Sequence, residues 1–146
     1  MKKLHPQPTK IYLDASVIIT ALLSVNGGSA KVIKLSNLGI FICLTSQTVI
    51  EEIEEHILKI KKNKREIQKF IVNSKIIVRE KIRLSEIEKI KKIDVRDAHL
   101  IAGAKLTECD FLVTLDKKHL LKPDIKKSFK PLKIVTPGEL LEIFIH

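Results

Sequence analysis

The chain has 146 residues, enough for one domain with its own hydrophobic core. Hydrophobic residues make up 45% of it and charged residues 30%, a balance that excludes an intrinsically disordered chain. The formal net charge of +10 favours a polyanionic partner such as nucleic acid, or an acidic protein, although a solvated lysine-rich surface explains it equally well. Aromatic residues make up only 4%, which argues against a single-strand-binding module built on stacking platforms.

The two cysteines, Cys43 and Cys109, lie in or beside apolar segments and lack a metal-binding spacing such as C-x-x-C. We expect both to be buried free thiols, which suits a reducing cytoplasm. A signal peptide is not expected, because His5, Pro6 and Pro8 stand where an apolar run would be needed. No apolar stretch approaches the roughly 20 residues that span a bilayer.

Short apolar strands alternate with helices along the first half of the chain. After a loose tail over residues 1–10, strands are expected at 11–13, 40–44 and 75–78. The first two helices should cover 17–23 and the stretch from Ser29 to a stop at Gly39. Thr45 or Ser46 should cap the third helix, and a basic stretch at 59–69 should lead into the fourth. The apolar positions of these two helices are Val49, Ile50, Ile53 and Ile57, then Ile67, Phe70, Ile71 and Val72.

The second half continues the alternation. A helix is expected at 84–93, and the next one opens near Asp97 with Asp94 as its cap. A turn at 108–110 then leads into a strand at 111–115, a helical turn at 117–121 and a lysine-rich loop. A last strand at 132–135 precedes a helix that begins at Pro137. This order predicts an α/β fold with a mostly parallel sheet, formed by residues 11–146 as a single domain.

Four acidic residues stand where such a sheet gathers functional groups. Asp14 and Asp116 each follow a strand, Asp97 opens the helix that leads into the Asp116 strand, and Glu52 lies in the first turns of a helix. The carboxyl ends of parallel strands meet at one edge of the sheet, so the four carboxylates could converge there. Such a cluster is costly unless a divalent cation neutralises it, and Mg²⁺ or Mn²⁺ held in this way can activate a water against a phosphodiester.

Each acid also has a purely structural interpretation. Asp14 could be a cap or turn residue, Asp97 could favour the N-terminus of its helix, and Asp116 could be a strand-end turn. Glu52 could belong to the solvated face of a helix that carries four glutamates. In that case the acids would be helix caps in an unrelated α/β domain and would lie scattered.

Other polar residues near these acids carry weaker signals. The hydroxyls of Ser16 and Thr114, two residues from Asp14 and Asp116, could orient a carboxylate or a water, although capping and strand propensity explain them too. His99 and His119 have no serine or cysteine partner at a recognisable elbow, so we interpret both as ordinary, partly exposed residues. Gly27 and Gly28 match no phosphate-binding glycine pattern.

Several stretches of the chain match the motifs of one family. IYLDASVI at 11–18 resembles an opening strand followed by a D-x-[NS]-V motif, and SQTVIEEI at 46–53 resembles a helix with an acidic position. DAHLIAGA at 97–104, DFLVTLD at 110–116 and IVTPGELL at 134–141 resemble its remaining motifs. The chain thus resembles the PIN domain family, in the branch similar to VapC-type toxins of toxin–antitoxin systems. It departs from many members at Ser16, where they carry asparagine.

This resemblance implies a three-layer α/β/α fold and a metal-dependent ribonuclease activity. Asp14, Glu52, Asp97 and Asp116 would be the catalytic, metal-binding acids for Mg²⁺ or Mn²⁺, with Glu51 left as an alternative to Glu52. RNA would be the substrate, held by the lysine-rich segments at 59–69 and 117–133. A homodimer and a cognate antitoxin are further expectations. The competing hypothesis is a catalytically inactive RNA-binding or interaction module on the same fold.

Overall fold

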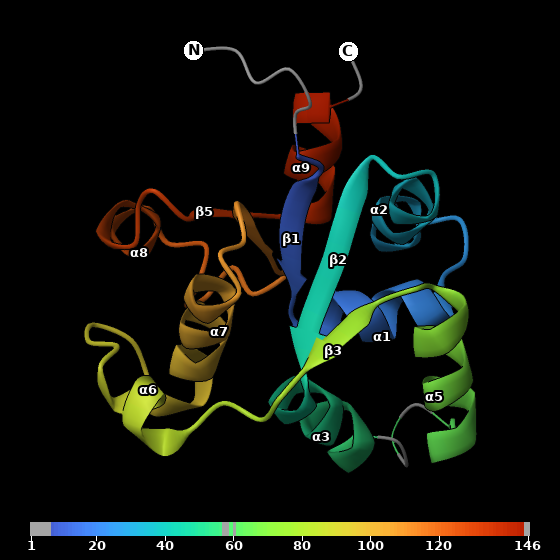
Figure 1. The fold of residues 1–146 in the computed structure, drawn as a ribbon, viewed down its shortest axis with the longest axis horizontal. Helices are drawn as coiled ribbons and strands as arrows, with labels where there is room; N and C mark the ends of the chain where they lie inside the picture. The colour runs from blue at the N-terminus through green and yellow to red at the C-terminus, as the bar shows by residue number, and fades with distance from the viewer. Residues whose placement is uncertain (1–6, 57–58, 60, 145–146) are drawn as a thin grey trace.

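The computed structural model describes residues 7–56, 59 and 61–144. Its centre is a five-stranded sheet in the order β3-β2-β1-β4-β5, and all four neighbouring pairs are parallel (Figure 1). The strands are β1 (Thr9–Leu13), β2 (Phe41–Ser46), β3 (Ile77–Arg79), β4 (Phe111–Val113) and β5 (Lys133–Val135). The predicted α/β class with a parallel sheet is confirmed.

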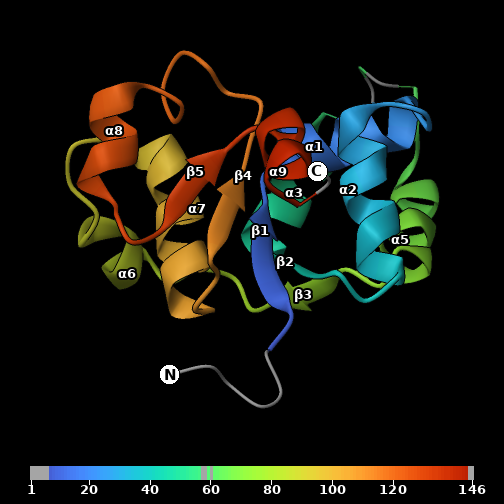
Figure 2. The same ribbon diagram turned by 90° about the horizontal axis from the view of Figure 1, so that it is seen from above.

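Helices connect the strands and flank the sheet. They are α1 (Ala15–Leu23), α2 (Gly28–Asn37), α3 (Gln47–Glu55), α5 (Lys64–Asn73), α6 (Leu84–Glu88), α7 (Val95–Leu106), α8 (Pro123–Ser128) and α9 (Pro137–Phe144). Figures 1 and 2 show α6, α7 and α8 on one side of β1 and β2, and α1, α2 and α5 on the other. The sheet with its two helical layers is the predicted α/β/α arrangement.

The core is built on β1, the middle strand of the sheet. Ile11, Tyr12 and Leu13 are fully buried, because helices cover both faces of this strand. The Tyr12 ring packs against α7 at Gly103, where a Cβ atom would overlap it. Burial raises the pKa of the Tyr12 hydroxyl to about 12. Apart from Tyr12, three phenylalanines and the two cysteines, the core is aliphatic.

Two further observations concern the burial of the cysteines and the lengths of the helices. Cys43 and Cys109 are buried free thiols, as predicted, and burial raises the pKa of Cys43 to about 12. Within the described residues no single helix is both long enough and apolar enough to cross a membrane. The α1 and α2 helices have the length and apolar composition of a membrane span only when they are taken together, and the chain bends by 94° between them.

Several predicted boundaries are wrong. β1 begins at Thr9, so Thr9 and Lys10 belong to the sheet rather than to a loose tail. The helix predicted over 84–93 ends at Glu88, and a non-helical connection, in which Lys92 has a positive φ of 77°, leads to the Asp94 cap of α7. The strand predicted to Leu115 ends at Val113, and Leu115 is 39% exposed.

Three further differences concern the helical segments. The lysine-rich loop contains α8, which begins at Pro123, a residue suited to the first turn of a helix. The segment 117–121, predicted as a helical turn, forms a non-helical turn. Val72 was assigned to an apolar helix face but is 74% exposed, whereas Ile67 and Ile71 are buried. Ile57, assigned to the face of the third helix, lies outside the described residues.

Candidate functional site

Asp14 and Thr114 leave the sheet side by side. Leu13 of β1 pairs with Val113 of β4, and the Asp14 N–H donates to the Val113 carbonyl at 3.1 Å. The next residue on each strand is therefore at the same carboxyl edge. There the Thr114 hydroxyl donates to Asp14 Oδ2 at 2.6 Å, and the Ser16 hydroxyl donates to the same oxygen at 3.2 Å. Of the roles that the sequence left open for Ser16 and Thr114, the structure shows that both hydroxyls bind a carboxylate.

The Asp14 carboxylate is held in a costly environment. The residue is 8% exposed, and burial raises the pKa of its carboxyl. The Thr114 hydrogen bond opposes this rise, while the nearby charge of Glu52 adds to it. A buried carboxylate of this kind gains from a cation placed next to it, because the cation offsets the loss of hydration and the repulsion.

Asp116 is held by the main chain instead. Its Oδ1 accepts the backbone N–H groups of Lys118 and His119, both at 3.1 Å. Its own N–H donates to the Thr114 hydroxyl at 3.1 Å, so one hydroxyl links Asp14 to Asp116. The turn after β4 therefore fixes the direction of the carboxylate and leaves Oδ2 facing the site.

Asp97 comes from the first turn of α7. Asp94 caps this helix, as predicted, by accepting the Arg96 N–H at 2.8 Å, and the Arg96 side chain pairs with the same carboxylate. Because Asp94 takes the capping role, the Asp97 carboxylate is free to face the sheet edge. Partial burial raises the pKa of Asp97, the nearby charge of Asp116 adds to the rise, and His119 opposes it.

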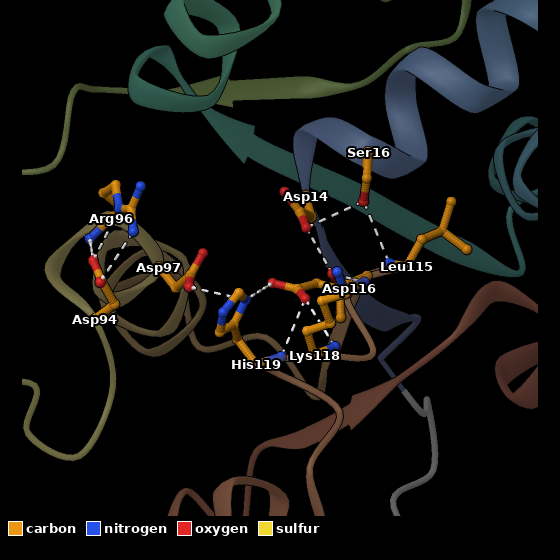
Figure 3. A network of polar contacts seen from close by, with 10 residues as sticks. Asp14, Ser16, Asp94, Arg96, Asp97, Leu115, Asp116, Lys118 and His119 are labelled. Carbon is orange, nitrogen blue, oxygen red and sulfur yellow. Dashed lines mark hydrogen bonds and ion pairs between the residues drawn. The ribbon is translucent and has the colours of Figure 1, made fainter.

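His119 completes a cluster with these two acids. Asp97, Asp116 and His119 each offer one ligand atom, and the three atoms all lie within 4.8 Å of one another. Figure 3 shows the His119 ring between the two carboxylates, with Asp14 close to Asp116. Two carboxylate oxygens and one imidazole nitrogen form a donor set that suits a divalent cation, so the residues present fit a metal site.

Glu52 lies next to Asp14, outside this three-residue cluster. Its Oε1 contacts His99 Nε2 of α7, but not in a hydrogen-bonding direction, and neither ring nitrogen of His99 has a hydrogen-bond partner among the described residues. Glu51 points elsewhere and pairs with Lys81 at 3.1 Å. Of the two glutamates, Glu52 is therefore the one at the acidic edge.

The histidine predictions need correction. His99 was expected to be partly exposed, but it is 4% exposed because residues 98–104 of α7 are all buried. The His119 side chain is 57% exposed, as expected, yet it is not an ordinary surface residue, because it contacts both Asp97 and Asp116. The spacing of three residues between Asp116 and His119, within a turn, is the sequence signal that could have indicated this contact.

The sequence matches the PIN domain family over residues 10–118. A search of curated proteins found no match. A chain from the structure of VapBC2 of Rickettsia felis, bound to a DNA fragment from their promoter, is similar with a TM-score of 0.63 and 15% identity, and the match covers 88% of this chain and 98% of that one. VapC20 of Mycobacterium tuberculosis, a toxin that cleaves the sarcin–ricin loop, is similar with a TM-score of 0.53 and 12% identity over 74% and 91%. At these identities the likeness concerns the fold.

Proposed function

Because the chain belongs to the PIN domain family, we infer that it is a divalent-metal-dependent endoribonuclease that acts in the cytoplasm as the toxin of a toxin–antitoxin pair. The observation that carries this proposal is the gathering of side chains from three distant segments at one sheet edge. Asp97, Asp116 and His119 place ligand atoms within 4.8 Å of one another, and Thr114 links Asp116 to Asp14. Acids that served only as helix caps would have no reason to gather in this way.

In this proposal Asp14, Glu52, Asp97 and Asp116 hold the cation, Mg²⁺ or Mn²⁺. When bound, the cation supplies the positive charge that polarises a phosphodiester and acidifies an attacking water. The Thr114 and Ser16 hydroxyls keep the Asp14 carboxylate pointing into the site, and the turn after β4 does the same for Asp116. The net charge of +10, concentrated in lysine-rich segments such as 117–133, would hold the RNA phosphates.

The proposed partners follow from the same family membership. A cognate antitoxin would neutralise the enzyme, and two copies would form a homodimer. The likeness to a chain of the VapBC2 complex supports this part of the proposal through the shared fold.

The alternative is a catalytically inactive RNA-binding or interaction module. One feature favours it: two of the four acids have partners within the protein, since Asp14 accepts two hydroxyl hydrogen bonds and Glu52 contacts His99. Such a module would bind RNA in a salt-sensitive way and would be indifferent to a chelator.

A cleavage assay separates the two functions. The pure protein is incubated with a mixed RNA pool in Mn²⁺ or Mg²⁺, and a parallel sample contains EDTA. The nuclease proposal expects cleavage with the metal and none with EDTA. Binding of RNA that persists in EDTA, with no cleavage under any condition, would instead establish the inactive module.

A further inference from the structure

The His119 ring faces two carboxylate oxygens from different parts of the chain. Its Nδ1 lies 3.1 Å from Asp116 Oδ2 and 3.9 Å from Asp97 Oδ2. The backbone holds the ring there, because the His119 N–H donates to Asp116 Oδ1. One atom of the side chain is thus directed at the point where the two acids meet (Figure 3).

The two oxygens of Asp116 have separate roles in this arrangement. Oδ1 accepts both backbone N–H groups of the turn, from Lys118 and His119. Oδ2 contacts only the His119 ring among the hydrogen bonds of the described residues. The oxygen that faces the site is therefore the one that a cation can take without breaking the turn.

The distances agree with a shared cation. Two ligands at neighbouring positions of an octahedral site, each about 2.1 Å from the ion, lie about 3 Å apart. His119 Nδ1 and Asp116 Oδ2 lie 3.1 Å apart, which is close to this ligand–ligand distance. The separation of 3.9 Å to Asp97 exceeds it by about 1 Å, a gap that a small rotation of the partly exposed Asp97 side chain can close.

We propose that His119 Nδ1 is a direct nitrogen ligand of the metal and that it makes the site prefer Mn²⁺ to Mg²⁺. Mg²⁺ is a hard ion that favours oxygen ligands, whereas imidazole binds more readily to first-row transition metals. The inference rests on the proposed metal-dependent function and adds a ligand that the four acids do not include. Without a cation, the same nitrogen lies at hydrogen-bonding distance from Asp116; a cation would take its lone pair.

Pulsed electron paramagnetic resonance of bound Mn²⁺ tests the ligand directly, since a coordinated nitrogen modulates the electron spin echo. The samples are the full chain, His119→Gln, and the matched control His56→Gln, which changes an exposed histidine at the end of α3. We expect nitrogen modulation in the parent and in His56→Gln, and its loss in His119→Gln. Labelling the parent with ¹⁵N-histidine should change the modulation frequency, and this readout requires no substitution.

Titrations with each metal give a second readout. His119→Gln should weaken Mn²⁺ binding by roughly 10-fold or more and Mg²⁺ binding by less, because the glutamine amide still offers an oxygen. Two results would overturn the nitrogen-ligand proposal alone: Mn²⁺ bound to the parent with no nitrogen signal, or a signal that survives His119→Gln. A parent that binds neither metal would overturn the proposed nuclease function along with it.

Discussion

Asp14 and Asp116 both follow a strand at the carboxyl edge of the sheet, but the fold holds them in different ways. Asp14 is buried next to β1, and side-chain hydroxyls from Ser16 and Thr114 hold its Oδ2. Asp116 is a quarter exposed beyond β4, and backbone N–H groups of the following turn hold its Oδ1. The inner acid depends on neighbouring side chains, whereas the outer acid depends on a local turn.

This difference separates two requirements of a carboxylate site. The main-chain bonds fix the direction of Asp116 while leaving one oxygen open to water and to His119. The burial of Asp14 makes its charge costly, so its ionised form gains most from a cation. Thr114 joins the two acids, because its hydroxyl donates to Asp14 and accepts from the Asp116 N–H.

The largest expected effect comes from removing either charge. Asp14→Asn and Asp116→Asn should each lower metal-dependent RNA cleavage by roughly 100-fold or more. Loss of a residue that only hydrogen-bonds to a metal ligand already lowers affinity or activity by about 10–100-fold, and loss of a direct ligand should lower it further. The measurement is the initial cleavage rate in saturating Mn²⁺, with circular dichroism to show that each variant is folded. The matched control is Glu88→Gln, which changes an exposed acid at the end of α6 and should keep the parent rate. If either site variant cleaves as fast as the parent, the metal-site assignment is wrong.

The link between the two acids can be broken separately. Thr114→Val keeps the shape of the buried side chain but removes the hydroxyl, so it should weaken Mn²⁺ binding by about 10–100-fold. It should also destabilise the protein by about 1–3 kcal/mol, because a buried acceptor loses its partner. Calorimetric titration and chemical denaturation measure the two effects. Thr114→Ser retains the hydroxyl and should stay close to the parent; a loss in Thr114→Ser with none in Thr114→Val would show that the methyl group, not the hydrogen bond, matters.

The positions of these acids could be predicted from sequence to different degrees. Asp14 and Asp116 follow apolar strands, and parallel strands share a carboxyl edge, so their meeting follows from the order of elements alone. Asp97 was placed by the recognition of Asp94 as the cap. His119 escaped prediction, because the direction of its ring depends on a turn that Asp116 itself organises. The contact between His99 and Glu52 also escaped it, since α7 is buried at every position from 98 to 104, and no apolar periodicity marks a polar residue in such a segment as buried.

The packing of β1 against α7 brings the inner acid and Asp97 to the same edge. Gly103 allows the Tyr12 ring to reach the helix, and a Cβ atom at this position would overlap that ring. Gly103→Ala should therefore destabilise the fold by about 1–3 kcal/mol through overpacking, even though alanine favours helices. Denaturation midpoints measure the loss. The double variant Gly103→Ala/Tyr12→Phe, in which the hydroxyl is absent, should recover part of it; no recovery would show that the hydroxyl is not the obstacle.

The smallest effect concerns the stability of the protein without metal. Burial raises the pKa of Asp14 above its ordinary value of 3.8, so the folded state binds this proton more tightly than the unfolded state does. The contribution of Asp14 to stability is thus most favourable below the ordinary value, and it is lost as the pH rises through the raised one. The amide that replaces the carboxyl in Asp14→Asn cannot ionise, so this variant avoids the loss.

In EDTA, the melting temperature of Asp14→Asn should therefore exceed that of the parent by a margin that grows as the pH rises from about 4 through the raised pKa of Asp14. Added Mn²⁺ should reverse the order, since it stabilises only the chain that binds it. A margin that stays constant with pH would mean that Asp14 is not destabilised by its own charge. The inner and outer acids would then differ in their hydrogen-bond partners but not in their need for a cation.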